Sequence, residues 1–313
     1  MRFFGETNIN FIGKRNVAYI ISAVIILAGL LSLVINKGPA YSVDFTGGIS
    51  LELDITPLNG GEAVDIQEVR DVLAKAGIEG AEIQEIKGIE GKKLILVKAK
   101  SEEGMADKIT NLIMKNFPKN VDPENFIRQR DEIGPKIGGE LRLGAIKAIF
   151  IGLLLIIIYI WWRFEFSFGF AAVLALFHDV LITVGIFSIT GKEISLPVVA
   201  ALLTIVGYSL NDTIVVFDRI REDLKLFRKQ PFGKVINRSI NETLSRTIIT
   251  SLTTFLVVLS LYLFGGTVIH DFAFALLIGV VVGTYSSIFI ASPTLVTLFN
   301  NKEAKQAKLS GRK

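Results

Sequence analysis

The sequence contains no cysteine and only two histidines among its 313 residues. Without cysteine, the chain cannot form disulfides, use a thiolate as a nucleophile or hold a metal through sulfur. His178 and His270 lie far apart in the sequence, which argues against a zinc site built on histidine. The lack of cysteine does not indicate a compartment, but any domain outside a membrane must be held together by its core alone.

Motifs of soluble enzymes are also missing. The sequence has no phosphate-binding loop of the G-x-x-x-x-G-K-[ST] type, no nucleophile elbow and no cluster of metal-ligating residues. We therefore expect neither an enzyme nor a resident cofactor. Without a site for ATP, any work that the protein performs must draw on an ion gradient or a partner. Moving one charge across 100 mV yields about 2.3 kcal/mol, so protons are a sufficient coupling ion.

Long apolar segments dominate what is present. Half of the residues are hydrophobic and the mean hydropathy is +0.51, which predicts a membrane protein in contact with lipid. About twenty apolar residues are needed to cross ~30 Å of hydrocarbon. Six predicted spans meet this need: residues 17–35, 143–162, 168–189, 196–217, 247–264 and 272–298. The first is too long for a signal peptide, and the last is long enough to be tilted or to contain a break before Pro293.

Basic residues lie in short stretches between the spans, which is the pattern of the positive-inside rule and not that of a nucleic-acid-binding protein. They gather in residues 1–16, 218–246 and 299–313, whereas the loops 190–195 and 265–271 hold one basic residue between them. Six crossings place the three basic regions on one side. We therefore expect a multi-pass protein of the cytoplasmic (inner) membrane with both termini, a basic loop at 218–246 and a basic tail at 299–313 in the cytoplasm.

Residues 37–140 are too long for a simple loop and are expected to form a periplasmic domain. This segment carries a net charge of −5, and the rest of the chain carries +9. Alternating side chains predict strands over residues 41–55, 81–87, 92–100 and 126–133, and helical periodicity predicts helices over 64–76 and 102–117. The order β-α-β-β-α-β suggests a ferredoxin-like α+β sandwich. Because that fold hosts many functions, it does not identify one.

A carboxylic acid, Asp212, lies inside the fourth predicted span after a long uncharged stretch. An ionised carboxylate in a membrane helix costs roughly 2.5–3.5 kcal/mol on insertion scales, so it normally faces a bundle interior and handles a proton, an ion or a buried partner. The alternative is a structural, hydrogen-bonded aspartate near the helix end. Small and polar residues that favour helix contacts lie on one face or beside it: Thr204, Gly207, Tyr208 and Asn211.

Arg246 begins the fifth predicted span from the same side as Asp212, so the two side chains could meet at similar depth. An ion pair would hold Asp212 ionised, and separation of the pair would let the acid take up a proton. This pattern predicts a proton relay. The alternative for Arg246 is an anchor that extends to the lipid headgroups.

A second acid, Asp179, follows His178 near the middle of the third span. It either handles protons or is neutral and hydrogen-bonded, with Thr183 one turn further on as a candidate partner. The last span carries Gly279 and Gly283 at four-residue spacing, which predicts a close-packing face. The hydroxyl groups of the fifth span, from Thr250 to Thr254, are interpreted as packing surfaces around the charged residues.

Six motifs resemble the SecF family of bacterial Sec translocase subunits. They are Val43–Gly48, Gly134–Leu141, Phe177–Val180, Gly207–Thr213, Phe217–Glu222 and Asn237–Thr247. The likeness extends over essentially the whole chain, and the block from the fourth to the fifth span is its most specific part.

The resemblance implies membership of the resistance-nodulation-division (RND) superfamily, with six spans and a ferredoxin-like periplasmic domain. It implies a SecD partner that forms a pseudo-symmetric pair with this chain and works with the SecYEG channel on a translocating preprotein. It also implies proton-pathway roles for Asp212 and Arg246, and export driven by the proton motive force.

Three functions follow from these patterns. We favour a proton-coupled accessory subunit of preprotein export that acts with SecD. Half of an RND exporter of lipids or small molecules is a second hypothesis, which the modest external domain disfavours. The third is a passive assembly scaffold, in which the buried acids only set the packing of the helices.

Overall fold

The computed structural model describes residues 7–58, 63–78, 81–87, 92–100, 102 and 104–300. The chain divides into two compact units, of which unit 1 comprises residues 1–40 and 148–313 and unit 2 comprises residues 41–147. Arg2 and the basic residues of 301–313, which contribute to the predicted orientation, lie outside the described residues.

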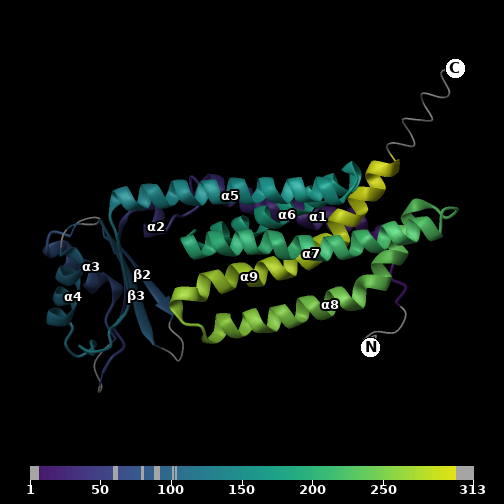
Figure 1. Cartoon of the computed structure of the whole chain (residues 1–313). Coiled ribbons are helices and arrows are strands. Elements are labelled where there is room, and N and C mark those ends of the chain that lie inside the picture. Colours follow the sequence, from purple (N-terminus) through teal and green to yellow (C-terminus); the bar gives the residue numbers. More distant parts are fainter. Residues whose placement is uncertain are drawn as a thin grey trace. The chain divides into compact units, whose positions relative to one another are not determined.

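Among the described residues, six helices are long and apolar enough to cross a membrane. They are α1 (Arg15–Ile35), α5 (Pro135–Arg163), α6 (Phe166–Thr190), α7 (Leu196–Leu226), α8 (Phe232–Phe264) and α9 (Thr267–Ser286) (Figure 1). The last continues through a π-helical turn, η3 (Ser287–Ala291), and the membrane-length helix ends at residue 300. The prediction of a polytopic helical membrane protein is confirmed.

The π-helical turn lies directly before Pro293, where the sequence allows a break. Proline lacks the N–H that an α-helix needs and its ring crowds the preceding turn, and single π turns are a common way to absorb such a defect. Ser292 contributes by donating its hydroxyl to the Ser287 carbonyl over 2.8 Å.

Residues 218–246 are mostly helical, so the predicted basic loop was wrong. Helix α7 continues to Leu226 and α8 begins at Phe232. Ion pairs at i,i+3 and i,i+4 spacing, such as Arg219–Glu222 and Arg238–Glu242, support the charged helix ends. A span predicted from uncharged runs stops at the first charge and therefore misses amphipathic extensions of the same helix.

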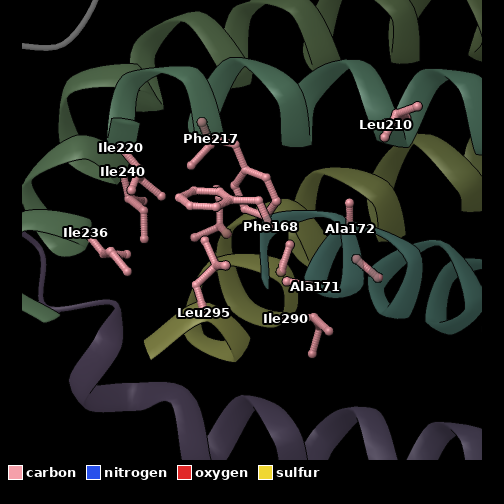
Figure 2. Packing of buried hydrophobic residues seen from close by; sticks show 14 of the residues in the cluster. Phe168, Ala171, Ala172, Leu210, Phe217, Ile220, Ile236, Ile240, Ile290 and Leu295 are labelled. Atoms are coloured by element: carbon pink, nitrogen blue, oxygen red, sulfur yellow. The ribbon is translucent and has the colours of Figure 1, made fainter. Parts of the chain in front are cut away.

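The core of unit 1 lies among α6, α7, α8 and the end of α9. Figure 2 shows Phe168 and Phe217 at its centre, with ring centroids 5.2 Å apart in an edge-to-face arrangement. Helices α6, α7 and α9 are more than half buried within the unit, whereas α1 and α5 expose large apolar side chains suited to lipid. Helix α1 approaches α6 closely, since a Cβ on Gly29 would lie 2.7 Å from the Gly185 Cα.

Unit 2 is built on a small antiparallel sheet. Its elements are β1 (Gly48–Asp54), α3 (Ile66–Lys75), β2 (Glu82–Lys87), β3 (Lys93–Ala99), α4 (Met105–Asn116) and β4 (Ile127–Ile133). The four strands are ordered β2-β3-β1-β4 with antiparallel neighbours. Helices α3 and α4 lie together against the sheet (Figure 1), and their apolar side chains share a core with Ile49, Leu51 and Leu53. The predicted element order is present; the name ferredoxin-like stays a prediction.

The predicted strand over residues 41–55 is correct only in its second half. Val43–Thr46 forms a short helix, α2, because the Ser42 hydroxyl accepts a hydrogen bond from the Asp44 N–H and caps its first turn. Gly47, with φ of +70°, ends this turn, and Gly48, with φ of +139°, starts β1. Both conformations favour glycine.

The two ends of unit 2 meet at these glycines. A Cβ on Gly47 would lie 2.8 Å from the Pro135 Cα, and a Cβ on Gly138 would lie 2.9 Å from the Gly47 N atom. The family-like motifs Val43–Gly48 and Gly134–Leu141 are therefore packed backbone to backbone, at a distance that only glycine permits.

Candidate functional site

The Asp179 carboxylate is fully buried in α6 and is bound from three directions. Its Oδ2 atom accepts hydrogen bonds from Ser209 of α7 at 2.5 Å and from Ser286 of α9 at 2.8 Å. Its Oδ1 atom lies 2.8 Å from Nδ1 of His178. These partners offset the large cost of placing a carboxylate in an apolar bundle. Thr183, expected as a partner, instead donates to the Asp179 backbone carbonyl at 2.8 Å.

His178 extends this network to α1. Its Nε2 atom lies 2.9 Å from the Ser22 hydroxyl, which is 3.2 Å from the Tyr285 hydroxyl. Tyr285 in turn donates to the Ala18 carbonyl at 2.8 Å. The order Ser22–His178–Asp179 matches the hydrogen-bond order of a hydrolase triad, but Ser22 is only 4% exposed in a membrane-length helix. The arrangement therefore joins four helices through polar contacts and leaves a substrate little surface to contact.

The Asp212 carboxylate belongs to a second network. Asp212 is 3% exposed on α7, and its Oδ2 atom accepts a hydrogen bond of 3.2 Å from Ser251 of α8. The Ser251 hydroxyl accepts one of 2.7 Å from Thr284 of α9. Because Thr284 and Ser286 lie two residues apart on α9, both buried acids are connected to the same short stretch of that helix.

Arg246 does not form the predicted ion pair. In the described part of the chain, no charged partner lies within the 4.0 Å of an ion pair from the Asp212 carboxylate, whose hydrogen bond comes from Ser251. Arg246 is exposed at its position on α8. Together with Asn211 it lines a cleft of about 1990 Å³ bordered by α7, α8 and the N-terminal segment. The arginine thus lines a polar cleft together with Asn211, the residue before the acid.

The polar stripe expected beside Asp212 faces away from the bundle. Thr204, Gly207 and Asn211 are exposed, and a Cβ on Gly207 would meet no atom within 4 Å. Thr204 donates to its own helix, at the Ala200 carbonyl. Tyr208 is half-buried, and its buried hydroxyl has no hydrogen-bond partner among the residues that the structure describes. The packing role predicted for Gly207 was therefore wrong within this chain, because helical spacing identifies a face but not its direction.

The glycines of the last span, for which the sequence predicts a packing role, lie against α7. A Cβ on Gly279 would overlap the side chain of Ile205, and one on Gly283 would lie 3.0 Å from the Ser209 Cβ. These contacts press α9 against α7. They bring Ser286 within reach of Asp179, so the glycines position the network although they carry no polar group.

Two family-like motifs meet where α7 and α8 extend beyond the apolar core. Arg219 of the first motif is paired with Glu242 of the second and lies 3.2 Å from buried Asp223. Ser239 donates to Asp223 at 2.7 Å. On the same side of α8, Asn237 and Asn241 bind the backbone of residues 9–12, with four of these bonds between 2.8 and 2.9 Å. These motifs therefore hold the ends of α7 and α8 and the N-terminal segment together.

Hydroxyl residues were the part of the site that sequence patterns missed. Ser22, Ser209 and Ser286 were not singled out, and Ser251 was interpreted only as packing. Isolated serines in apolar helices are common interhelical hydrogen-bonding groups, so their presence was a signal. Their partners could not be assigned because the contacts cross 30 to 156 sequence positions.

Comparisons with known proteins agree with this architecture. The family model "Protein export membrane protein SecD/SecF, C-terminal" matches residues 113–301. The protein translocase subunit SecF of Thermodesulfovibrio yellowstonii is 44% identical over 310 residues, covering 98% of this chain and 100% of that protein. The protein translocase subunit SecDF of Thermus thermophilus is 41% identical over 308 residues, covering 96% of this chain and 40% of that protein.

A crystal structure of SecDF from the genus Thermus, described as a translocon-associated membrane protein, is similar to this chain with a TM-score of 0.80 and 39% sequence identity. The similarity covers 94% of this chain and 39% of that chain. The present chain thus spans about two fifths of the SecDF protein, but all of the SecF relative.

Six membrane-length helices with acids buried among hydroxyl groups, and a small α+β unit inserted after the first helix, define a polytopic membrane protein of the transport type. The similarity to the SecF relative, which extends over nearly the full length of this chain, identifies the family within that class. The chain belongs to the SecF family of protein translocase subunits, which are transport subunits and not enzymes.

Proposed function

We propose that this protein is an accessory subunit of the Sec translocase, driven by the proton motive force, that acts with SecD to promote late stages of preprotein export. The observation that carries the proposal is the connection of two buried acids to one helix. Ser286 binds Asp179, and Thr284 reaches Asp212 through Ser251. A change of charge at either acid therefore alters contacts of α9.

The assembly proposed for the chain includes SecD, the SecYEG channel and the translocating preprotein. Support for SecD comes from the relative named SecDF, in which the region similar to this chain makes up 40% of the protein. The basic residues of 1–16, 218–246 and 299–313 support a position in the inner membrane with both termini in the cytoplasm. Unit 2 would then lie on the periplasmic side.

Asp212 is the proposed proton-binding group of this cycle, with the proton as coupling ion. When it is ionised, Ser251 donates to a charged oxygen, and such bonds contribute about 1.5–3 kcal/mol against roughly 0.5–1.5 kcal/mol for neutral pairs. Proton uptake would weaken the bond between α7 and α8 and free Ser251 to rotate toward Thr284. Arg246, which lines the cleft beside Asn211, would favour the ionised state and so promote release of the proton.

The test compares export of a secreted reporter in cells depleted of their own subunit, with each variant present at matched membrane levels. Asp212→Asn keeps the shape of the side chain but cannot titrate, and it should abolish most export while assembly with SecD stays normal. Asp212→Glu should retain part of the activity. Asp122→Asn, which removes a half-buried carboxylate of unit 2, is the matched control and should export normally.

Retained export in Asp212→Asn would contradict the proposal and favour the scaffold hypothesis. Loss of both export and assembly would also count against it, because the aspartate would then be needed for the fold and not for proton transfer.

A further inference from the structure

The loop between α6 and α7 contacts both α9 and Ala40, which lies in the segment between α1 and unit 2. Lys192 Nζ lies 2.5 Å from the Asp271 carboxylate of α9 and 4.9 Å from the centre of the Phe274 ring. Two residues further on, the Ile194 N–H donates to the Ala40 carbonyl over 2.7 Å. Ala40 is the last residue of unit 1 before the chain continues into unit 2. Lys192 and Ile194 thus contact both α9 and Ala40, the residue at which the chain passes from unit 1 into unit 2.

Local backbone geometry fixes the lysine in this place. Gly191 ends α6 with φ of +66°, and the Lys192 N–H donates to the Phe187 carbonyl over 3.0 Å. This is the glycine-terminated cap that closes many helices. Helix α7 begins at Leu196 with Ser195 as its N-cap, so the loop is short and capped at both ends. A movement of Asp271 would therefore reach Ile194, and through it Ala40, by way of the short backbone segment that follows Lys192.

Lys192 is also the single Lys or Arg in the two segments 190–195 and 265–271, which the sequence predicts as loops between spans. A partly exposed ion pair contributes little to stability, and the Lys192 and Asp271 side chains are 23% and 38% exposed. The aromatic face of Phe274 adds a cation–π contact on the same helix. Two contacts from one ammonium group to α9 favour a positioning role over a general contribution to folding.

We infer that Lys192 is a coupling residue that transmits movement of α9 to Ala40 and hence to unit 2. The inference rests on the proposed function, since it needs α9 to move when the acids change charge. Helix α9 carries Ser286 and Thr284 toward the acids and Asp271 toward the loop. Among the described residues, α9 is the helix whose side-chain contacts join both buried acids to the α6–α7 loop.

The link itself is tested by disulfide formation in native membranes. The chain has no cysteine, so Ala40→Cys with Ile194→Cys reports on this contact alone, and a backbone hydrogen bond brings the pair within reach of a disulfide. Under mild oxidant the pair should cross-link rapidly. Lys192→Asn should slow cross-linking about two- to fivefold, in keeping with the loss of a partly exposed pair. Exchange of the charges, Lys192→Asp with Asp271→Lys, should recover most of the rate.

Export is measured in parallel, with the full chain at matched levels beside its native partners. Lys192→Asn should lower the rate of reporter export, and the charge exchange should restore it. The control is Lys37→Asn, which removes an exposed lysine just after α1, where asparagine tolerates the positive φ of 59°. It should change neither cross-linking nor export.

Unchanged cross-linking in Lys192→Asn would overturn the inference, and so would slower cross-linking with normal export. Failure of the charge exchange to restore both would have the same meaning. If Asp212→Asn exports normally while the Lys192 results hold, the proposed proton role fails and the link between α9 and unit 2 stands.

Discussion

Ser286 of α9 and Asp179 of α6 are joined by a hydrogen bond of 2.8 Å across 107 positions of sequence. The same carboxylate oxygen also binds Ser209 of α7. Asp179 is therefore the point at which three helices of unit 1 are joined through one carboxyl group. Because charge-assisted hydrogen bonds are stronger than neutral ones, the state of this carboxylate affects all three helices.

Removal of the Ser286 hydroxyl should destabilise unit 1 modestly. Ser286→Ala deletes one hydrogen bond to a buried carboxylate that keeps two other partners, so we expect a loss of about 1–2 kcal/mol. The measurement is the midpoint of thermal unfolding of the full chain in detergent. Ser260→Ala is the control, since that exposed hydroxyl donates to the Val257 carbonyl of its own helix and, in the described part of the chain, to no other helix. Equal shifts in the two variants would refute a special role of Ser286.

Two glycine substitutions should have opposite effects. Gly279→Ala forces a methyl group into Ile205 and should cost about 1–3 kcal/mol by overpacking. Gly207→Ala places its methyl group in open space and should stabilise the isolated chain by up to roughly 1 kcal/mol, since alanine favours helices. The measurement is the free energy of unfolding of both variants in detergent, compared with that of the wild-type chain. Combination of Gly279→Ala with Ile205→Ala should recover part of the loss, and failure to do so would point to another contact.

The stability of unit 2 should depend on pH through Asp54. Burial raises the pKa of Asp54, but hydrogen bonds from Thr56 and Arg128 and the Arg128 charge lower this pKa by more, so that the net shift is downward. A lowered pKa stabilises the folded state above the unfolded value of about 3.9, and this stabilisation is lost as the pH falls through the folded pKa. Asp54→Asn should therefore weaken unit 2 at neutral pH and flatten the acid side of the curve.

Asp131 is the control, because its pKa is shifted in the opposite direction to that of Asp54. Burial raises the pKa of Asp131, as does the charge of Asp44, against a hydrogen bond from Gln129. Its contribution is present at low pH and is lost as the pH rises, so Asp131→Asn should not weaken unit 2 at neutral pH. The urea concentration at which β1 amides lose protection from exchange, measured in the full chain at each pH, tests both variants. If Asp131→Asn lowered the stability of unit 2 at neutral pH and Asp54→Asn did not, the directions that we assign to the two pKa shifts would be wrong.

The N-terminal segment should detach when its asparagine contacts are removed. Asn237 binds the backbone of Ile9, Phe11 and Ile12. Asn237→Ala should leave these backbone groups without partners and raise amide exchange in residues 9–12 several-fold. Asn116→Ala, which affects a hydrogen bond within α4, is the control. Protection of residues 9–12 that survives in Asn237→Ala would mean that Asn241 alone is sufficient.

Hydropathy and periodicity predicted the six helices and the order of elements in unit 2, because burial in a core or in lipid leaves a local pattern. They failed where charge and helix coincide, as in residues 218–246, where buried Ile220, Ile236 and Ile240 continue the helical face past the first charges. They also failed at Val43–Thr46, where a single Ser42 cap outweighs an alternating pattern.

The candidate site was predictable in its acids but not in its contacts. A charge in an apolar helix is visible in the sequence, so Asp179 and Asp212 were identified. Their partners depend on the rotation of each helix, which decides that Asp212 faces Ser251 and that Arg246 faces a cleft. Rotation is set by packing at positions such as Gly279 against Ile205, and no pattern within one helix reports it.

The contact between Gly47 and Pro135 has a consequence for how such proteins can vary. Residues 41–147 leave and rejoin the rest of the chain through two backbone segments that touch each other. A segment whose ends are adjacent can be inserted, exchanged or enlarged without a change in the path of the flanking helices. Unit 2 is therefore a cassette, and chimeras joined at these two glycine-rich motifs should keep the helical unit intact while they replace what it carries.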